Sequence, residues 1–241
     1  MNLIIDVGNS FIKFALFDAN KLIDFKSEKI IDWETALENF INGRRIKKII
    51  FSTVSIDSDI LLAKLLLIAP VLKMSTHLKF PINIKYKSIE TLGTDRLCGT
   101  IGALVLYGKT NTLVIDCGTC ITYNFLEGGN DFIGGSISPG IELRYKALHS
   151  FTKNLPYLET KGKKPQLLGS DTNSSIESGV LNGVLFEMEG AIDQYKLKFG
   201  LINVILTGGN HTYFANNLKN TTFAHPNLVL IGLNDILEYN T

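Results

Sequence analysis

The feature of this sequence that most constrains its fold is an internal duplication. Residues 3–12 read Leu-Ile-Ile-Asp-Val-Gly-Asn-Ser-Phe-Ile, and residues 113–122 read Leu-Val-Ile-Asp-Cys-Gly-Thr-Cys-Ile-Thr. In each copy an apolar run ends in an aspartate, Asp6 or Asp116. One residue, a glycine and small polar residues follow before a second apolar segment begins. Self-similarity at this distance predicts two related domains, each opening with a strand, a tight turn and a second strand.

The periodicity of the apolar residues extends this organisation over both halves and predicts the α/β class. In the first half we expect strands at 2–7, 12–17, 22–29 and 47–54, helices at 33–41 and 59–67, and a connecting stretch to 108. In the second half, after the turn at Asp116, we expect a strand running into a loop over 132–140, helices at 141–148 and 175–199, an exposed loop at 152–173, and strands at 204–207 and 228–231. The expected domains are residues 1–108 and 109–241.

Composition excludes several classes of partner. With a formal net charge of +1, the chain of 241 residues has no general attraction for nucleic acid or anionic lipid. No basic segment precedes the first apolar run, and the longest apolar stretch is interrupted by Pro70, so we expect neither a secretory signal nor a membrane span. Three cysteines suit a reducing cytoplasm. Cys117 and Cys120 form a C-x-x-C, but no second pair or neighbouring histidine completes a zinc site.

The two duplicated turns have the chemistry of a phosphate site. Gly8 allows close approach of the backbone, whose N–H groups can converge on an anion. Lys13 lies just beyond the first turn and can reach a terminal phosphate. The carboxylates of Asp6 and Asp116 stand at strand ends, where they can hold a cation directly or through water. Further amide or hydroxyl donors are Asn9, Ser10, Thr119 and Thr122. A single such hairpin is often only a turn; two copies favour a nucleotide held between them.

Two further motifs are informative. Thr207-Gly208-Gly209-Asn210 follows a predicted strand and suits a flat ring lying on glycine backbone. Gly93-Thr94-Asp95-Arg96 has two interpretations. It is either a solvated helix start with Thr94 as N-cap, or a general base, Asp95, beside a substrate-binding arginine. The signatures G-x-x-x-x-G-K-[ST] and G-x-G-x-x-G are absent, which disfavours P-loop and Rossmann nucleotide binding.

Taken in order, these motifs resemble those of the type III pantothenate kinases, a family of the acetate and sugar kinase, heat-shock ATPase and actin superfamily. The resemblance rests on residues 6–10 with Lys13, 93–96, 116–119 with Thr122, 134–140 and 207–209. It implies two duplicated ribonuclease-H-like (actin-like ATPase) domains, each a mixed sheet flanked by helices. The implied activity is ATP-dependent phosphorylation of pantothenate, the first step of coenzyme A biosynthesis.

The resemblance also implies residue roles. Asp95 would be the catalytic base, Asp116 the ligand of a monovalent cation (potassium or ammonium), and Asp6 a ligand of magnesium through water. The implied ATP-binding residues are Asp6, Val7, Gly8, Asn9, Ser10, Phe11, Ile12, Lys13, Thr119, Gly208 and Gly209. The implied pantothenate-binding residues are Tyr86, Gly93, Thr94, Asp95, Arg96 and Thr172. Ser10 stands where the family usually has threonine, which keeps the hydroxyl.

Thr172 matches a threonine that reaches the substrate site of a neighbouring subunit, so the resemblance implies a homodimer with a shared active site. The predicted helix at 175–199 carries Gly179, Gly183 and Gly190, each costing it about 1 kcal/mol relative to alanine. Glycines at this spacing suggest close approach of another helix or of a second subunit. Three alternatives stay open: a kinase for another small hydroxyl substrate, a nucleotide-binding regulatory protein without turnover, and a heat-shock-like or actin-like ATPase, for which the chain is short.

Overall fold

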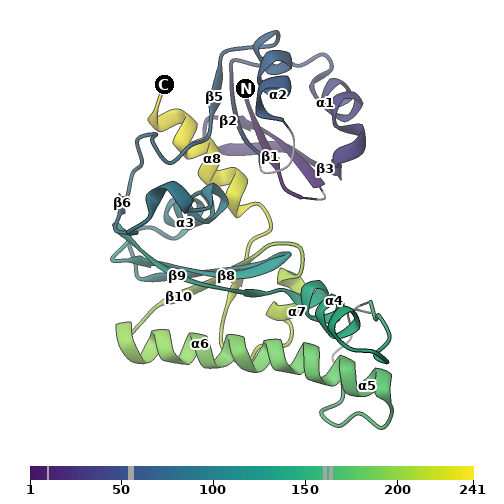
Figure 1. The fold of residues 1–241 in the computed structure, drawn as a ribbon. Coiled ribbons are helices and arrows are strands. Elements are labelled where there is room, and N and C mark those ends of the chain that lie inside the picture. Colours follow the sequence, from purple (N-terminus) through teal and green to yellow (C-terminus); the bar gives the residue numbers. More distant parts are fainter. Residues whose placement is uncertain (10, 54–56, 160–161, 163–164) are drawn as a thin grey trace. The chain divides into compact units, whose positions relative to one another are not determined.

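The computed structural model describes residues 1–9, 11–53, 57–159, 162 and 165–241. The chain forms two compact units (Figure 1). Unit 1 contains residues 1–108 together with 227–241, and unit 2 contains residues 109–226. The boundary after residue 108 coincides with the predicted one, whereas residues 227–241 lie in the first unit and not in the second.

Unit 1 is built on a mixed five-stranded sheet in the order β3-β2-β1-β4-β5. Strands β1 to β3 are antiparallel, and β4 and β5 run parallel to β1. The strands are β1 (Asn2–Val7), β2 (Phe11–Asp18), β3 (Lys21–Lys29), β4 (Lys48–Thr53) and β5 (Val71–Lys73). The apolar runs in β1, β2 and β4 are almost wholly buried, which is why these segments form the centre of the sheet.

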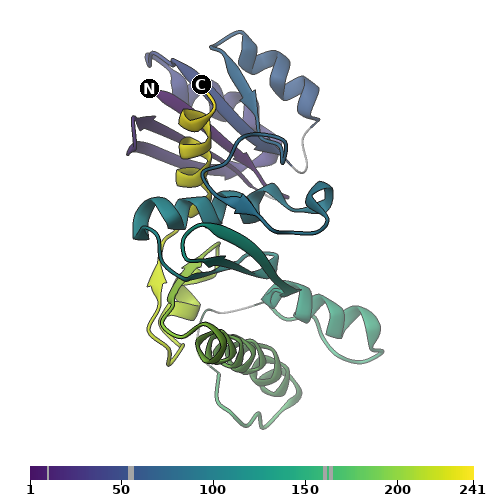
Figure 2. The same cartoon turned by 90° about the vertical axis from the view of Figure 1, so that its left-hand side faces the viewer.

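Helices cover both faces of this sheet (Figure 2). On one face, Leu37 and Phe40 of α1 join Leu61 and Leu65 of α2 over a shared apolar core. On the other face, α8 lies against β1 and β4, and Asn234 accepts a hydrogen bond from Asn2 at 3.0 Å. The helical elements are η1 (Ile30–Asp32), α1 (Trp33–Ile41), α2 (Ser58–Leu66), η2 (Ile89–Thr91), α3 (Thr94–Tyr107) and α8 (Leu228–Tyr239); a short strand, β6 (Asn83–Ile84), precedes η2.

Two predictions for this unit were wrong. The stretch predicted as a connection contains the 14-residue helix α3, and the strand predicted at 228–231 is the first turn of the 12-residue helix α8. These two helices pack on each other through glycines. A Cβ on Gly102 would lie 2.1 Å from the carbonyl oxygen of Leu228, and one on Gly232 would lie 1.8 Å from that of Cys98. This tertiary packing determines both segments, and a short apolar run alone does not distinguish helix from strand.

Unit 2 repeats the topology of unit 1. Within the unit the strand order is β9-β8-β7-β10-β11, with β7 to β9 antiparallel and β10 and β11 parallel to β7. The strands are β7 (Thr112–Cys117), β8 (Cys120–Glu127), β9 (Asp131–Pro139), β10 (Asn203–Thr207) and β11 (Phe223–Ala224). The two mixed sheets confirm the predicted duplication and the α/β class.

The duplication extends to burial and to strand irregularities. The burial pattern along β7 matches that along β1, and that along β8 matches β2. The register shifts at Leu16/Phe17 in β2 and at Phe125/Leu126 in β8, which are equivalent positions. The turn is one residue shorter in unit 2. Thr122 therefore stands opposite Asp116, where Lys13 stands opposite Asp6.

The helices of unit 2 are α4 (Ile141–Phe151), α5 (Thr172–Glu177), α6 (Gly183–Phe199) and α7 (His211–Ala215), with a π-helical segment η3 (Ser178–Asn182) between α5 and α6. The single helix predicted at 175–199 thus begins at Thr172 and contains a π-helical turn. Helix α6 runs along one face of the sheet (Figure 1) and buries Val184, Met188 and Ile192 there. In the described part of the chain, no helix combines the length and the apolar character needed to cross a membrane.

Candidate active site

The first turn lies at the end of β1. The Gly8 N–H donates to the Phe11 carbonyl at 3.0 Å, which closes the turn. Asn9 and Phe11 are exposed, whereas the side chains of Val7 and Ile12 are buried in the core, so only their backbone can reach a ligand. Ser10 lies outside the described residues.

Asp6 and Lys13 face each other across this hairpin. They are partners in the β1–β2 register, and Lys13 Nζ lies 3.6 Å from Asp6 Oδ2. Burial raises the pKa of Asp6, Lys13 lowers it, and the Asp95 carboxylate raises it again, leaving the pKa above its ordinary value. Asp95 therefore lies close enough to Asp6 to disfavour a second negative charge.

Asp95 occupies the first turn of α3. Gly93 is the N-cap and Thr94 the first helical residue, so the predicted Thr94 cap was wrong by one position. The Asp95 Oδ1 accepts the Arg96 N–H at 2.9 Å. A Cβ on Gly93 would lie 2.5 Å from this oxygen, so the missing side chain provides the space for the carboxylate. The side chain of Asp95 is nevertheless exposed and available to a ligand.

Other contacts in unit 1 hold this turn in place. Ser52, at the end of β4 and beside Asp6 in the sheet register, has its Oγ 3.1 Å from the Thr94 Oγ1. The Arg96 guanidinium is buried and stands over the ring of Tyr86, 5.5 Å from its centre. Unit 1 thus brings five of the predicted pantothenate-binding residues together: Tyr86, Gly93, Thr94, Asp95 and Arg96.

Gly140 packs against the second turn, which contains Gly118 and Thr119. The Gly118 N–H donates to Cys120 at 3.1 Å, and the Gly140 N–H donates to the Thr119 carbonyl at 3.0 Å. A Cβ on Gly140 would lie 2.4 Å from the Gly118 carbonyl oxygen. The Thr119 side chain is exposed at the tip of the turn.

Asp116 lies against the predicted adenine turn. Gly208 has φ +84°, and a Cβ there would lie 2.2 Å from the Asp116 Oδ1. The Asn210 N–H donates to the Cys117 carbonyl at 3.0 Å, which joins the two turns. Unit 2 therefore collects Thr119, Asp116 and the Gly208-Gly209 turn at the ends of adjacent strands.

Thr172 lies elsewhere in unit 2, at the first residue of α5. Asp171 caps this helix through the Ser174 N–H at 3.0 Å. Thr172 is exposed and lines a cavity of about 740 Å³ together with Arg144 and Gly179.

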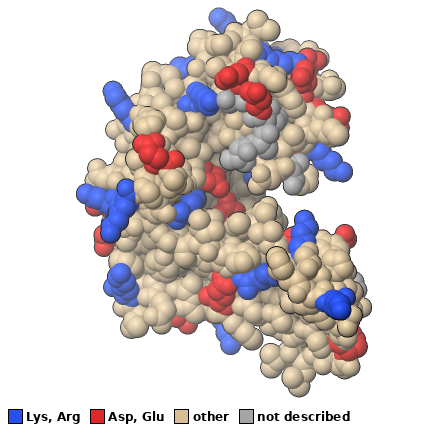
Figure 3. Space-filling view, viewed as in Figure 1, with Lys and Arg blue, Asp and Glu red and all other residues tan. Residues whose placement is uncertain are grey.

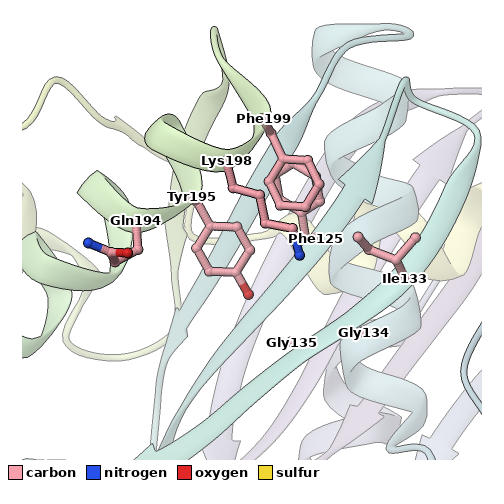
Figure 4. A pocket seen from close by; sticks show the side chains of 8 residues that line it. All are labelled: Phe125, Ile133, Gly134, Gly135, Gln194, Tyr195, Lys198 and Phe199. Carbon is pink, nitrogen blue, oxygen red and sulfur yellow. The ribbon is translucent and has the colours of Figure 1, made fainter.

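A second cavity, of about 260 Å³, contains none of the predicted site residues (Figure 4). Its wall is an aromatic stack in which Phe125 lies 5.1 Å from Tyr195 and 4.2 Å from Phe199, centre to centre.

On the face shown in Figure 3, Lys and Arg side chains are interspersed with Asp and Glu.

The donor set suits hard cations bound together with a phosphate ligand. Among the described residues, no three His, Cys, Asp or Glu side chains form a dedicated metal cluster. Magnesium bound with a nucleotide needs only one or two carboxylates, since phosphate oxygens and waters complete its shell. Asp6 in unit 1 fits that role, and the Asp116 carboxylate beside Gly208 offers oxygen ligands for a second cation.

Three residues with notable contacts lie outside every sequence motif: Ser52, and the ion-paired Arg144 and Glu187. Ser52 is the last residue but one of an apolar strand and has no motif around it. Arg144 and Glu187 lie on helices with ordinary amphipathic patterns. Their contacts depend on tertiary structure and gave no local signal.

Comparison with known proteins identifies the family. Residues 2–194 match the family model of type III pantothenate kinase. A type III pantothenate kinase of Cytophaga hutchinsonii is 42% identical over 243 residues, covering all of both chains. One from Bacteroides fragilis is 41% identical, covering all of this chain and 98% of the relative.

Solved structures share the fold at low identity. A Campylobacter jejuni chain described as a Baf family transcriptional activator has a TM-score of 0.63 at 19% identity, covering 99% of this chain and 98% of that one. The activator of 2-hydroxyisocaproyl-CoA dehydratase from Clostridium difficile has a TM-score of 0.55 at 10% identity, covering 99% of this chain and 96% of that one. These likenesses, with those to sugar kinases, confirm the actin-like ATPase fold class. On the match of the family model and the full-length relatives, this chain belongs to the type III pantothenate kinase family.

Proposed function

We propose that this chain transfers the terminal phosphoryl group of ATP to the primary hydroxyl of pantothenate, giving 4′-phosphopantothenate in the first step of coenzyme A biosynthesis. The observation that carries the proposal is the exposed Asp95 carboxylate, held at the start of α3 beside Arg96 and close to Asp6. Phosphoryl transfer needs a general base, such as an ionised carboxylate, to orient and deprotonate the attacking hydroxyl, and otherwise depends on positioning and charge neutralisation.

In this mechanism Asp95 receives the proton of the pantothenate hydroxyl as the new O–P bond forms and the bond between the γ-phosphorus and its bridging oxygen breaks, releasing ADP. Its bond from the Arg96 N–H keeps the carboxylate in one orientation. The Arg96 guanidinium, which lies over the ring of Tyr86, pairs with the pantothenate carboxylate in this proposal. Lys13 supplies positive charge to the transferring group.

The nucleotide contacts divide between the two turns. The backbone of the first turn, residues 6–13, and Thr119 of the second take the phosphates, and Gly208 with Gly209 takes the adenosine. Magnesium accompanies ATP and is held through water by Asp6. Asp116 takes a monovalent cation, potassium or ammonium.

We further propose a homodimer in which Thr172 reaches the pantothenate site of the partner. A Cβ on Gly179, Gly183 or Gly190 would meet nothing within 4 Å in the described part of this chain. Phe186, on the same stripe, is 62% exposed. Among the described residues, none lies within 4 Å of these Cβ positions, which favours a second copy of the chain as the partner of this stripe. The cytoplasm is the compartment we propose, since all three cysteines are free thiols.

The test is ADP release by the purified protein with ATP, Mg²⁺, K⁺ and pantothenate. Asp95→Asn is expected to lower pantothenate-dependent turnover by roughly 10²–10⁴-fold, the usual contribution of a general base, with ATP affinity nearly unchanged. Glu90→Gln, which neutralises an exposed acid in the preceding turn, is the matched control and should keep full activity.

Two results would contradict the proposal in different ways. Turnover that does not depend on pantothenate, with ATP still bound, points to another hydroxyl acceptor or to a nucleotide-binding regulator. Full pantothenate-dependent activity of Asp95→Asn places the base elsewhere.

A further inference from the structure

Arg144, in the first turns of α4, connects three groups in unit 2. Its Nε donates to the Pro139 carbonyl at 2.8 Å, and its Nη2 donates to the Ser138 Oγ at 2.8 Å. The same Nη2 forms an ion pair with the Oε2 of Glu187 on α6. The guanidinium thus reaches back from α4 and holds the last two residues of β9.

Glu187 is itself held from the core. Its Oε1 accepts the Tyr123 hydroxyl at 3.0 Å, and Tyr123 is a buried residue of β8. Burial raises the pKa of Glu187, but bonds from Arg144, Ser138 and Tyr123 outweigh it and leave the pKa below its ordinary value. Glu187 is therefore a charged and fixed anchor for Arg144. Such a planar, two-sided contact suits arginine and not lysine.

The end of β9 packs tightly against the second turn, the one that contains Thr119. Pro139 pairs with Cys120 across the β8–β9 ladder. The next residue, Gly140, donates to the Thr119 carbonyl at 3.0 Å, and its Cα is so close that a Cβ would lie 2.5 Å from that oxygen. A displacement of Pro139 and Gly140 is consequently transmitted to Thr119.

We infer that Arg144, anchored by Glu187, is a positioning residue for nucleotide binding, which fixes the phosphate turn at Thr119 through the backbone of Pro139 and Gly140. The inference rests on the proposed function, in which Thr119 contacts ATP. It assigns Arg144 a role through the loop and no contact with pantothenate.

The test is direct titration of ATP–Mg²⁺ into the purified protein without pantothenate, together with steady-state kinetics for both substrates. Arg144→Lys keeps the positive charge but loses the planar guanidinium that contacts several partners at once. Glu187→Gln keeps the shape of the side chain but loses the negative charge that pairs with Arg144. Each is expected to raise the Kd and KM for ATP about 10-fold while the KM for pantothenate stays within about 2-fold, because only the phosphate turn moves. Lys146→Gln, an exposed position on the same helix, is the matched control and should change neither.

A double variant tests the coupling. If both side chains act through one loop, Arg144→Lys with Glu187→Gln should weaken ATP binding little more than either change alone. Unchanged ATP affinity in both single variants overturns the inference, as does a rise confined to the KM for pantothenate, which would make Arg144 a substrate contact. If Arg144→Lys does not fold, Glu187→Gln alone decides. Because the titration omits pantothenate, it is independent of whether pantothenate is the acceptor.

Discussion

At the scale of single residues, two glycines of the site matter because they have no Cβ atom. The space that a Cβ would fill at Gly93 is taken by a carboxylate oxygen of Asp95, and the space at Gly208 by one of Asp116. Gly208 also needs its positive φ. Gly93 has φ −56°, which any residue can adopt, so its role is steric. Each glycine therefore leaves space for the carboxylate of one of the two aspartates proposed to act in the site.

Gly93→Ala should separate function from stability. The added methyl group meets only the flexible end of the Asp95 side chain, which can rotate away at little cost in folding free energy. We expect kcat to fall by up to about 100-fold because the base is misplaced, with a thermal midpoint close to wild type. Steady-state kinetics and thermal unfolding on the same preparation check this. A variant that keeps full kcat would show that the Asp95 orientation seen here is unimportant for turnover.

The raised pKa of Asp6 gives a prediction about stability. Burial and Asp95 make the folded-state pKa higher than the ordinary value of 3.8, so the folded chain binds more protons between the two values. Stability contributed by this group therefore falls as the pH rises through that interval. Asp6→Asn should unfold at a higher temperature than wild type at pH 7, and the difference should disappear below pH 3.8.

Thermal unfolding at several pH values tests this, with each kcal/mol worth about 2–4 °C in a chain of this size. The partly exposed ion pair that Lys13 loses is worth little. A lower unfolding temperature for Asp6→Asn at pH 7 would mean that the pair with Lys13 outweighs the cost of burying the carboxylate.

At the scale of elements, the two hairpins share strand lengths, burial and bulge positions but differ at their turns. The first turn is longer and places Lys13 opposite its aspartate; the second is shorter and places Thr122 there. One scaffold thus presents a cationic turn and a neutral hydroxyl turn. This difference agrees with the proposed division between the transferring phosphoryl group and the rest of the nucleotide.

The helix pair of unit 1 should be sensitive to one methyl group. Gly102→Ala puts a Cβ into the backbone of Leu228, which cannot move as a side chain can. We expect the free energy of unfolding to fall by roughly 1–3 kcal/mol, as at other overpacked sites. Gly179 lies in the π-helical segment η3, and among the described residues nothing lies within 4 Å of a Cβ placed there. Gly179→Ala should therefore stabilise the monomer by about 1 kcal/mol. Denaturant unfolding compares the two, and a neutral Gly102→Ala would contradict the close packing of α3 and α8.

Local patterns predicted most elements but not those defined by tertiary contacts. The strand at 2–7 and the helix at 33–41 were predicted to the residue, because the first is an apolar run of strand length that ends in a turn and the second has helical spacing. Only the start of helix α3 was considered, as one interpretation of residues 93–96, and α8 was taken for a strand. Both are apolar segments whose state depends on the packing of Gly102 against Leu228. The same holds for the site. Its sequence motifs could be recognised, whereas the ion pair between Arg144 and Glu187 joins two separate helices and could not be predicted from local sequence.

At the scale of the whole molecule, the exposed stripe of α6 predicts the oligomeric state. Phe186, flanked by Gly183 and Gly190, is a large apolar side chain that the described residues of unit 2 leave mostly exposed. Phe186→Glu is expected to convert a dimer into a monomer in light scattering after gel filtration. Turnover should fall with it, since Thr172 would no longer reach a partner site. Leu201→Glu, also highly exposed but beyond the helix, is the control and should remain dimeric; a wild-type monomer with full activity would contradict the shared site.

The central claim is that the primary hydroxyl of pantothenate receives the phosphoryl group. The most direct measurement is ³¹P and ¹H NMR of a complete reaction of the purified chain with ATP, Mg²⁺, K⁺ and pantothenate. We predict a phosphomonoester signal coupled to the methylene protons of the primary carbon, appearing in step with ADP. Pantothenate recovered unchanged, or ADP accompanied only by inorganic phosphate, would contradict the claim.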